Sequence, residues 1–141
     1  MRLFSYFFAV GILLLGVQGC NGGSSTPRTT PTPTPPPARV AGNYTGSNVD
    51  SVQGRGIVSA NIVQAGSKLA GGWSFSYPDN PSIVTSFAGS VTASAVALSV
   101  PAELGVPCSY SVMGTASGKQ ISGSYSSSNC GDSGTFMISR P

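Results

Sequence analysis

The sequence predicts an all-β fold, an eight-stranded antiparallel up-and-down meander that closes into a small barrel. From Val40 onward the chain is rich in Gly, Ser, Val, Thr and aromatic residues, and it has no apolar repeat of helical period. Turn-forming residues recur at short, regular intervals, which is typical of a sandwich or a barrel. Trp73, Phe75 and Tyr77 alternate with small residues, as in a half-buried strand. A two-sheet β-sandwich is the alternative.

Between the turn signals the chain divides into short strands of alternating character. We expect them at residues 42–48, 56–64, 68–77, 83–91, 95–101, 108–116, 119–127 and 133–140. Residues 40–141 are enough for one domain with a modest core. The sequence therefore predicts a single β domain after residue 39.

Three two-residue turns, at Gly66-Ser67, Ala93-Ser94 and Ser117-Gly118, fix the predicted pairing of the strands. The pairs that then share a surface are Ala60–Trp73, Val58–Phe75, Val91–Val96, Phe87–Val100, Tyr110–Tyr125 and Val112–Gly123. A one-residue slip would turn the apolar set of a strand outward. The agreement of three turns with three apolar faces therefore supports these hairpins.

The other connections look longer, at about 49–55, 78–82, 102–107 and 128–132, and in a meander they share one end of the barrel. All four acidic residues fall in or beside them: Asp50, Asp79, Glu103 and Asp132. Lys68, Lys119 and Arg140 lie at the opposite, tight-turn end. We treat the acids as a candidate ligand rim. The alternative is that carboxylates simply favour turns.

The first twenty residues have the pattern of an export signal. Arg2 precedes an uncharged apolar run, 3–17, which is shorter than the ~20 residues of a membrane-spanning helix. The run ends in Val-Gln-Gly-Cys, which resembles the lipobox of bacterial lipoproteins, with Gln18 a less usual occupant of its position. The resemblance implies that residues 1–19 are a cleaved signal peptide and that Cys20 carries the lipid. An ordinary secretory signal is the alternative.

Asn21 follows the cysteine where many inner-membrane lipoproteins have aspartate, so the resemblance implies an anchor in the outer membrane of a Gram-negative cell. Six prolines then fall within 21–39, and proline disfavours both helix and sheet interior. We expect residues 20–39 to be a lipidated cysteine followed by an extended, disordered linker. An oxidising compartment past the inner membrane predicts a Cys108–Cys130 disulfide, with reactive thiols or a metal pair as alternatives.

The ends of the predicted barrel carry a second resemblance. Gly42-Asn43-Tyr44 opens the first strand, and Arg140 follows Phe136 and Ile138 on one face of the last strand. The chain is similar to small Gly/Ser/Thr-rich barrels of bacterial envelope lipoproteins and, more distantly, to the calycins, which include lipocalins. Lipocalins open with Gly-x-Trp and place an arginine over that ring. The resemblance implies a cation–π plug of Arg140 on Tyr44, with tyrosine in place of tryptophan. An exposed terminal arginine is the alternative.

The composition and motifs of the chain argue against several classes of function. The chain has no histidine and few charged residues, and from Val40 onward its four bases and four acids balance, so a nucleic-acid surface is not expected. No nucleophile elbow, Ser-x-x-Lys or phosphate loop is present, and we predict no enzyme, cofactor or metal. A carboxylate pair among the rim acids is the one catalytic alternative.

Two functions remain. The sequence favours a membrane-anchored envelope lipoprotein with a structural or interaction role, whose partner is a protein or glycan, because six inward-facing rings would largely fill so small a barrel. The alternative is a binding module for a small ligand or glycan at the long-loop end. An empty, lined pocket of several hundred Å³ would favour the binding module.

Overall fold

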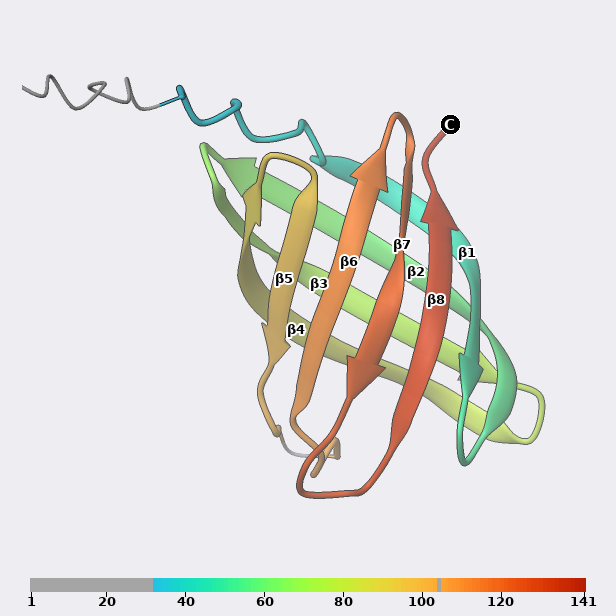
Figure 1. Cartoon of the computed structure of the whole chain (residues 1–141). Helices are drawn as coiled ribbons and strands as arrows, with labels where there is room; N and C mark the ends of the chain where they lie inside the picture. Colours follow the sequence, from blue (N-terminus) through green and yellow to red (C-terminus); the bar gives the residue numbers. More distant parts are fainter. Residues whose placement is uncertain (1–31, 104) are drawn as a thin grey trace, which may run out of the picture. The chain divides into compact units, whose positions relative to one another are not determined.

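A computed structural model of the chain describes residues 32–103 and 105–141. Its regular structure is entirely β. The strands are β1 (Gly42–Asp50), β2 (Gly54–Ala65), β3 (Lys68–Tyr77), β4 (Asn80–Thr92), β5 (Ala95–Val100), β6 (Tyr110–Ser117), β7 (Gln120–Ser126) and β8 (Ser133–Ser139). Each pairs with the next, and β8 pairs with β1 to close the barrel (Figure 1). The predicted eight-stranded meander is confirmed, and the sandwich alternative is wrong.

Two of the three predicted hairpins have the strand register that the sequence predicts. Ala65 pairs with Lys68 around Gly66-Ser67, which sets Ala60 opposite Trp73. Thr92 pairs with Ala95 around Ala93-Ser94, and Ala93 has the positive φ, 50°, that such a turn needs. Both hairpins are confirmed.

The third hairpin corrects the prediction. Ser117 pairs with Gln120, so the turn is Gly118-Lys119 and Tyr125 lies opposite Val112 rather than Tyr110. The pairing is displaced by two residues, which keeps each side chain on its expected face. The apolar pattern therefore could not reveal the error.

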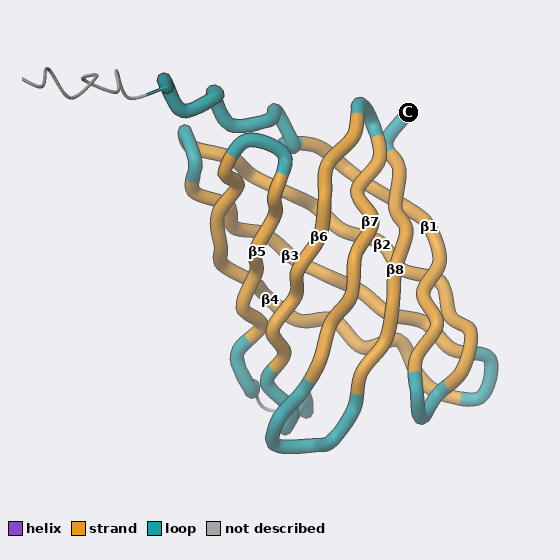
Figure 2. The backbone as a smooth tube through the Cα atoms, in the orientation of Figure 1, coloured by secondary structure: helices purple, strands orange, loops and turns teal. Residues whose placement is uncertain are grey.

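The connections at the other end also differ from expectation. The β1–β2 and β3–β4 connections are short turns, 51–53 and 78–79, while the long ones are 101–109 and 127–132. We call the end with these connections the loop end, and the end with the Gly66-Ser67, Ala93-Ser94 and Gly118-Lys119 turns the turn end (Figure 2). Asp50 was expected in a loop but is the last residue of β1 and is buried, because its carboxylate is held inside the barrel mouth.

The core fills the turn end. Val91, Val96 and Ile138 are almost fully buried there. The segment before β1 covers this end. The Ala38 N–H donates to the Ala93 carbonyl, and Val40 joins the core with 1% of its surface exposed.

Residues 32–41 before β1 contain no helix or strand. The predicted signal peptide, Cys20 and most of the linker lie outside the described residues. Within 32–103 and 105–141, the structure has no helix of the length and apolarity needed to cross a membrane.

Candidate functional site

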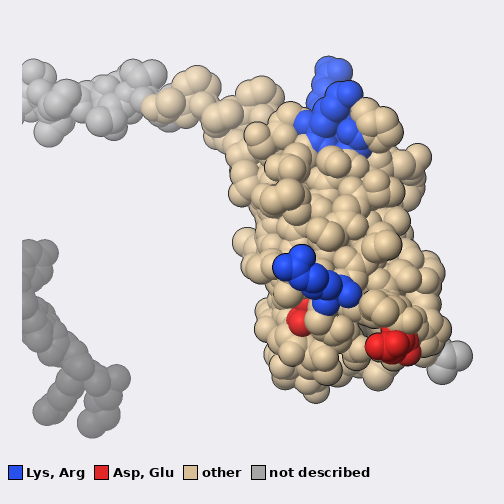
Figure 3. Space-filling model, turned by 90° about the vertical axis from the view of Figure 1, so that its right-hand side faces the viewer, with Lys and Arg blue, Asp and Glu red and all other residues tan. Residues whose placement is uncertain are grey.

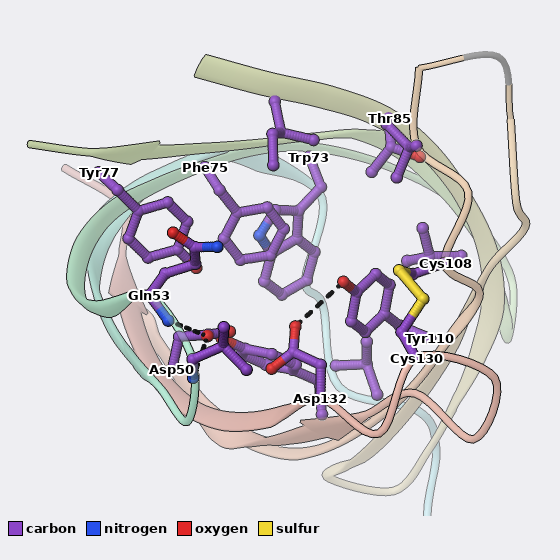
Figure 4. A pocket seen from close by; sticks show the side chains of 16 residues that line it. Asp50, Gln53, Trp73, Phe75, Tyr77, Thr85, Cys108, Tyr110, Cys130 and Asp132 are labelled. Carbon is purple, nitrogen blue, oxygen red and sulfur yellow. Dashed lines mark hydrogen bonds between the residues drawn. A yellow bond between two sulfur atoms is a disulfide. The ribbon is translucent and has the colours of Figure 1, made fainter. Parts of the chain in front are cut away.

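The barrel is hollow at its loop end. A cavity of about 290 Å³ lies there between the strands (Figure 4). Its lining is mostly aromatic and aliphatic, with a few polar groups near the mouth. The lining residues are Asp50, Val52, Gln53, Trp73, Phe75, Tyr77, Ile83, Thr85, Val100, Val106, Cys108, Tyr110, Val112, Tyr125, Cys130 and Asp132.

Three rings of the cavity wall come from β3, because every second residue of a strand faces the same side. Trp73 lies nearest the middle of the strand, and Phe75 and Tyr77 follow towards the mouth. The Trp73 and Phe75 rings stack with centroids 5.5 Å apart, and Phe136 packs edge-on against Trp73 at 5.1 Å. Trp73 therefore separates the hollow loop end from the filled turn end.

Two tyrosines continue the wall on the opposite strands. The Tyr125 ring lies 5.9 Å from Phe75 and 5.9 Å from Tyr110, centroid to centroid. Tyr125 lies over its partner Gly134, where a Cβ atom would collide with the ring. Glycine at that position is therefore what lets the ring lie flat against β8. The result is a continuous arc of Trp73, Phe75, Tyr125 and Tyr110.

One polar atom in this wall lacks a partner. The Trp73 indole N–H is fully buried and has no hydrogen-bond acceptor among the described residues. An unpaired buried donor costs free energy, about 1–3 kcal/mol.

Asp50 sits at the cavity mouth in a dense hydrogen-bond network. Its carboxylate accepts from the Tyr125 hydroxyl at 2.6 Å and from the backbone N–H groups of Val52 and Gln53 at 2.9 and 2.8 Å. Burial opposes the charged form, but these donors outweigh it and hold the pKa of Asp50 below its ordinary value. Asp50 is therefore an anion at neutral pH, although it is 6% exposed.

The same network orders the tyrosines around it. The Asn48 amide donates to the Tyr77 hydroxyl at 2.7 Å and to the Tyr125 hydroxyl at 3.2 Å. Burial, with the hydrogen bond to Asp50, raises the pKa of Tyr125 far above the ordinary tyrosine value, and burial also raises the pKa of Tyr77. Both hydroxyls therefore stay protonated, and the Tyr125 hydroxyl keeps its proton on the hydrogen bond to Asp50.

Asp132 is a second carboxylate at the mouth. It accepts from the Tyr110 hydroxyl at 3.2 Å and from the Ser51 hydroxyl at 3.0 Å. Burial and the charge of Asp132 raise the pKa of Tyr110 to about 12. Figure 4 shows Asp50 and Asp132 facing the row of β3 rings across the opening.

The predicted disulfide is present and forms part of the cavity wall. Cys108 and Cys130 are bonded, with Cα atoms 5.7 Å apart. Asn129 strengthens the link between the two long connections, because its side chain accepts from the Ser109 N–H at 3.1 Å and donates to the Pro107 carbonyl at 3.0 Å. The disulfide therefore holds one side of the mouth in place.

The four predicted rim acids do not share one site. Asp50 and Asp132 line the cavity. Asp79 is exposed in the β3–β4 turn, and the Glu103 carboxylate accepts a hydrogen bond from Ser86 away from the cavity. Gln53, in the 51–53 turn, also lines the cavity, and the sequence analysis did not identify it as a site residue. Asp50 was expected in a loop, so nothing in the sequence indicated that this turn would lie at the barrel mouth.

Tyr44 and Arg140 lie at the turn end, away from the cavity. The Arg140 guanidinium carbon is 5.9 Å from the centre of the Tyr44 ring. The guanidinium also donates to the carbonyls of Ala41 and Arg39 at 2.6 and 3.2 Å. Burial raises the pKa of Tyr44, partly offset by the charge of Arg140. The pair closes the turn end together with the segment before β1.

Most basic side chains lie at the turn end of the barrel, and acidic side chains lie at the loop end. Figure 3 shows Lys and Arg gathered at the turn end and acidic groups at the loop end, with another basic group beside them. Arg55, which pairs with Val49 near the loop end, is exposed and does not line the cavity. No cluster of His, Cys, Asp and Glu in residues 32–103 and 105–141 is arranged to hold a metal ion.

Together these features define a small antiparallel β-barrel with one end filled and the other hollow, which fits a calycin-like fold. No family model matches the sequence, and no curated protein matches it. Among solved structures, the chain is similar to a redesigned β-barrel, at 13% identity and a TM-score of 0.58 over 72% of this chain and 91% of that one. This similarity concerns the fold alone.

Proposed function

We propose that the domain is a binding module for a small, largely apolar molecule, held in the loop-end cavity of a lipid-anchored envelope protein. The observation that carries the proposal is the cavity of about 290 Å³ beside a well-packed core. Ligand pockets usually measure ~300–1,000 Å³, so a molecule of two or three rings is the appropriate size.

The composition of the wall supports a ligand rather than a purely structural role. Unfilled space in a core costs stability, yet the wall of this cavity is built from large rings held in place by hydrogen bonds and a disulfide. Flat apolar faces with few polar groups are the usual composition of a small-molecule site.

Trp73 is the only tryptophan of the chain, so its fluorescence reports directly on the cavity. The probe is N-phenyl-1-naphthylamine, a neutral aromatic, added to the chain carrying Cys20→Ser so that no detergent competes. We expect saturable energy transfer from Trp73 to the probe. Val112→Phe, which fills the cavity from β6, should weaken binding at least about tenfold.

The matched control is Val84→Phe on the outer face of β4, where the valine is 69% exposed. It should bind like the parent chain. Val100→Phe provides a second cavity-filling variant if Val112→Phe does not fold. Equal affinity in filled and control variants would exclude the cavity as the binding site.

The lipid anchor at Cys20 is part of the same proposal, and it is supported by the lipobox resemblance of residues 17–20. Several acyl chains would hold the protein firmly on a membrane, since each buried CH₂ contributes ~0.8 kcal/mol. We expect Cys20→Ser to move the protein from the outer-membrane fraction to the soluble fraction. Ser25→Ala is the control and should remain membrane-bound; a Cys20→Ser chain that also stayed bound would contradict the anchor.

A further inference from the structure

We infer that the loop-end cavity selects small organic cations, such as quaternary or protonated amines, over neutral and anionic molecules of the same shape. The inference rests on the proposed function and names the chemical class of its ligand. It is carried by the juxtaposition of two carboxylates with an arc of aromatic rings in one cavity.

The first step is the charge of the lining. Asp50 and Asp132 are its two ionisable carboxylates, and no Lys or Arg is among the lining residues. Their hydrogen-bond donors are hydroxyl and backbone N–H groups, which stabilise a carboxylate without neutralising it. No basic side chain of the lining therefore balances the two carboxylates, and Arg55 lies near the loop end but outside the lining.

The second step is the aromatic wall. Ring faces attract cations, and quaternary ammonium groups are recognised in proteins by cages of aromatic rings. Trp73, Phe75 and Tyr77 face the two carboxylates across the opening, so a cation between them would contact ring faces on one side and anions on the other. The low polarity of the wall strengthens both attractions.

The third step links the two sets of groups. Tyr125 donates its hydroxyl proton to Asp50, and Tyr110 donates to Asp132. A phenol that donates to an anion is polarised towards phenolate, which makes its ring face more electron-rich. The hydrogen bonds therefore increase the attraction of both rings for a cation.

The experiment compares three molecules of nearly equal shape: choline, the neutral 3,3-dimethylbutan-1-ol and the anionic 3,3-dimethylbutanoate. Each competes with N-phenyl-1-naphthylamine on the Cys20→Ser chain. We expect choline to displace the probe at a concentration at least about tenfold lower than the alcohol. The carboxylate should be the weakest competitor.

Asp132→Asn should reduce the preference for choline over the alcohol several-fold. Asp79→Asn is the matched control, because Asp79 is an exposed acid outside the cavity lining. An equal loss in both variants would assign the effect to the overall field of the protein and overturn the inference.

The remaining outcomes separate this inference from the proposed function. If choline and the alcohol compete equally, or if none of the three competes, cation selectivity is wrong while binding of the probe still supports a ligand site. If N-phenyl-1-naphthylamine itself fails to bind the parent chain, the proposed function fails and this inference fails with it.

Discussion

The turn end and the loop end of the barrel are built from the same strands but are filled in different ways. At the turn end, branched aliphatic side chains such as Val91, Val96 and Ile138 interdigitate, and the segment before β1 covers them. At the loop end, flat rings line the wall and leave space between them. Aliphatic residues adapt their shape to fill a volume, whereas rings held by hydrogen bonds keep their places.

The two ends are also held together by different forces. At the turn end, two-residue turns join neighbouring strands and the packed core holds the strands together. At the loop end the disulfide and the Asp50 network take over the role that packing has at the other end. The comparison indicates that packing stabilises the turn end, whereas cross-links and hydrogen bonds stabilise the loop end and leave space there for a ligand.

Removal of the disulfide should have the largest effect on the free energy of unfolding among the changes that test this comparison. Replacing both cysteines, Cys108→Ala with Cys130→Ala, should lower the free energy of unfolding by about 3 kcal/mol, because the bond closes a loop over a sequence separation of 22. Urea unfolding measures the loss. Hydrogen exchange should quicken in 101–109 and 127–132 but not at the turn end.

The parent chain under reducing conditions is the control, and it should lose a similar free energy of unfolding. If the double variant were as stable as the parent, the disulfide would contribute nothing to the loop end. If exchange quickened equally at both ends, the two ends would form one cooperative unit and the comparison would lose its basis.

Much of the fold could be predicted from the sequence, because period-two alternation and turn residues act locally. The register of the third hairpin could not, since a shift of two residues keeps every side chain on its face. A local signal was nonetheless present. Gly66 has φ 63° at the first position of its turn, and Gly118 has φ 59° at the same position of its own. Placing Gly118 first would have given the observed pairing.

The candidate site was predicted only in part. The inward direction of Trp73, Phe75 and Tyr77 follows from alternation, and the disulfide partners were correctly named. The empty space was not predictable, because it depends on ring tilt and on where glycine lets a ring lie against the wall, as at Gly134. Asp50 was expected in or beside a loop, because nothing in its neighbours indicates that Tyr125, far away in the chain, donates to it.

The smallest expected effect is also the sharpest test of the difference between the two ends. Val91 at the turn end is fully buried in packed core, and Val112 at the loop end is equally buried but lines the cavity. Val91→Ala should cost about 2 kcal/mol, because it opens a new void in a filled region. Val112→Ala should cost about 1 kcal/mol less, because its side chain already borders empty space and has fewer contacts to lose.

The two substitutions remove the same atoms from strands inside a closed barrel, so their effects on strand propensity should largely cancel. Urea unfolding with equal slopes for both variants measures the difference directly. N-phenyl-1-naphthylamine binding gives the opposite order: Val112→Ala should change the affinity for the probe, and Val91→Ala should not. Equal losses of stability, with unchanged binding in both, would mean that the loop end is packed as tightly as the turn end.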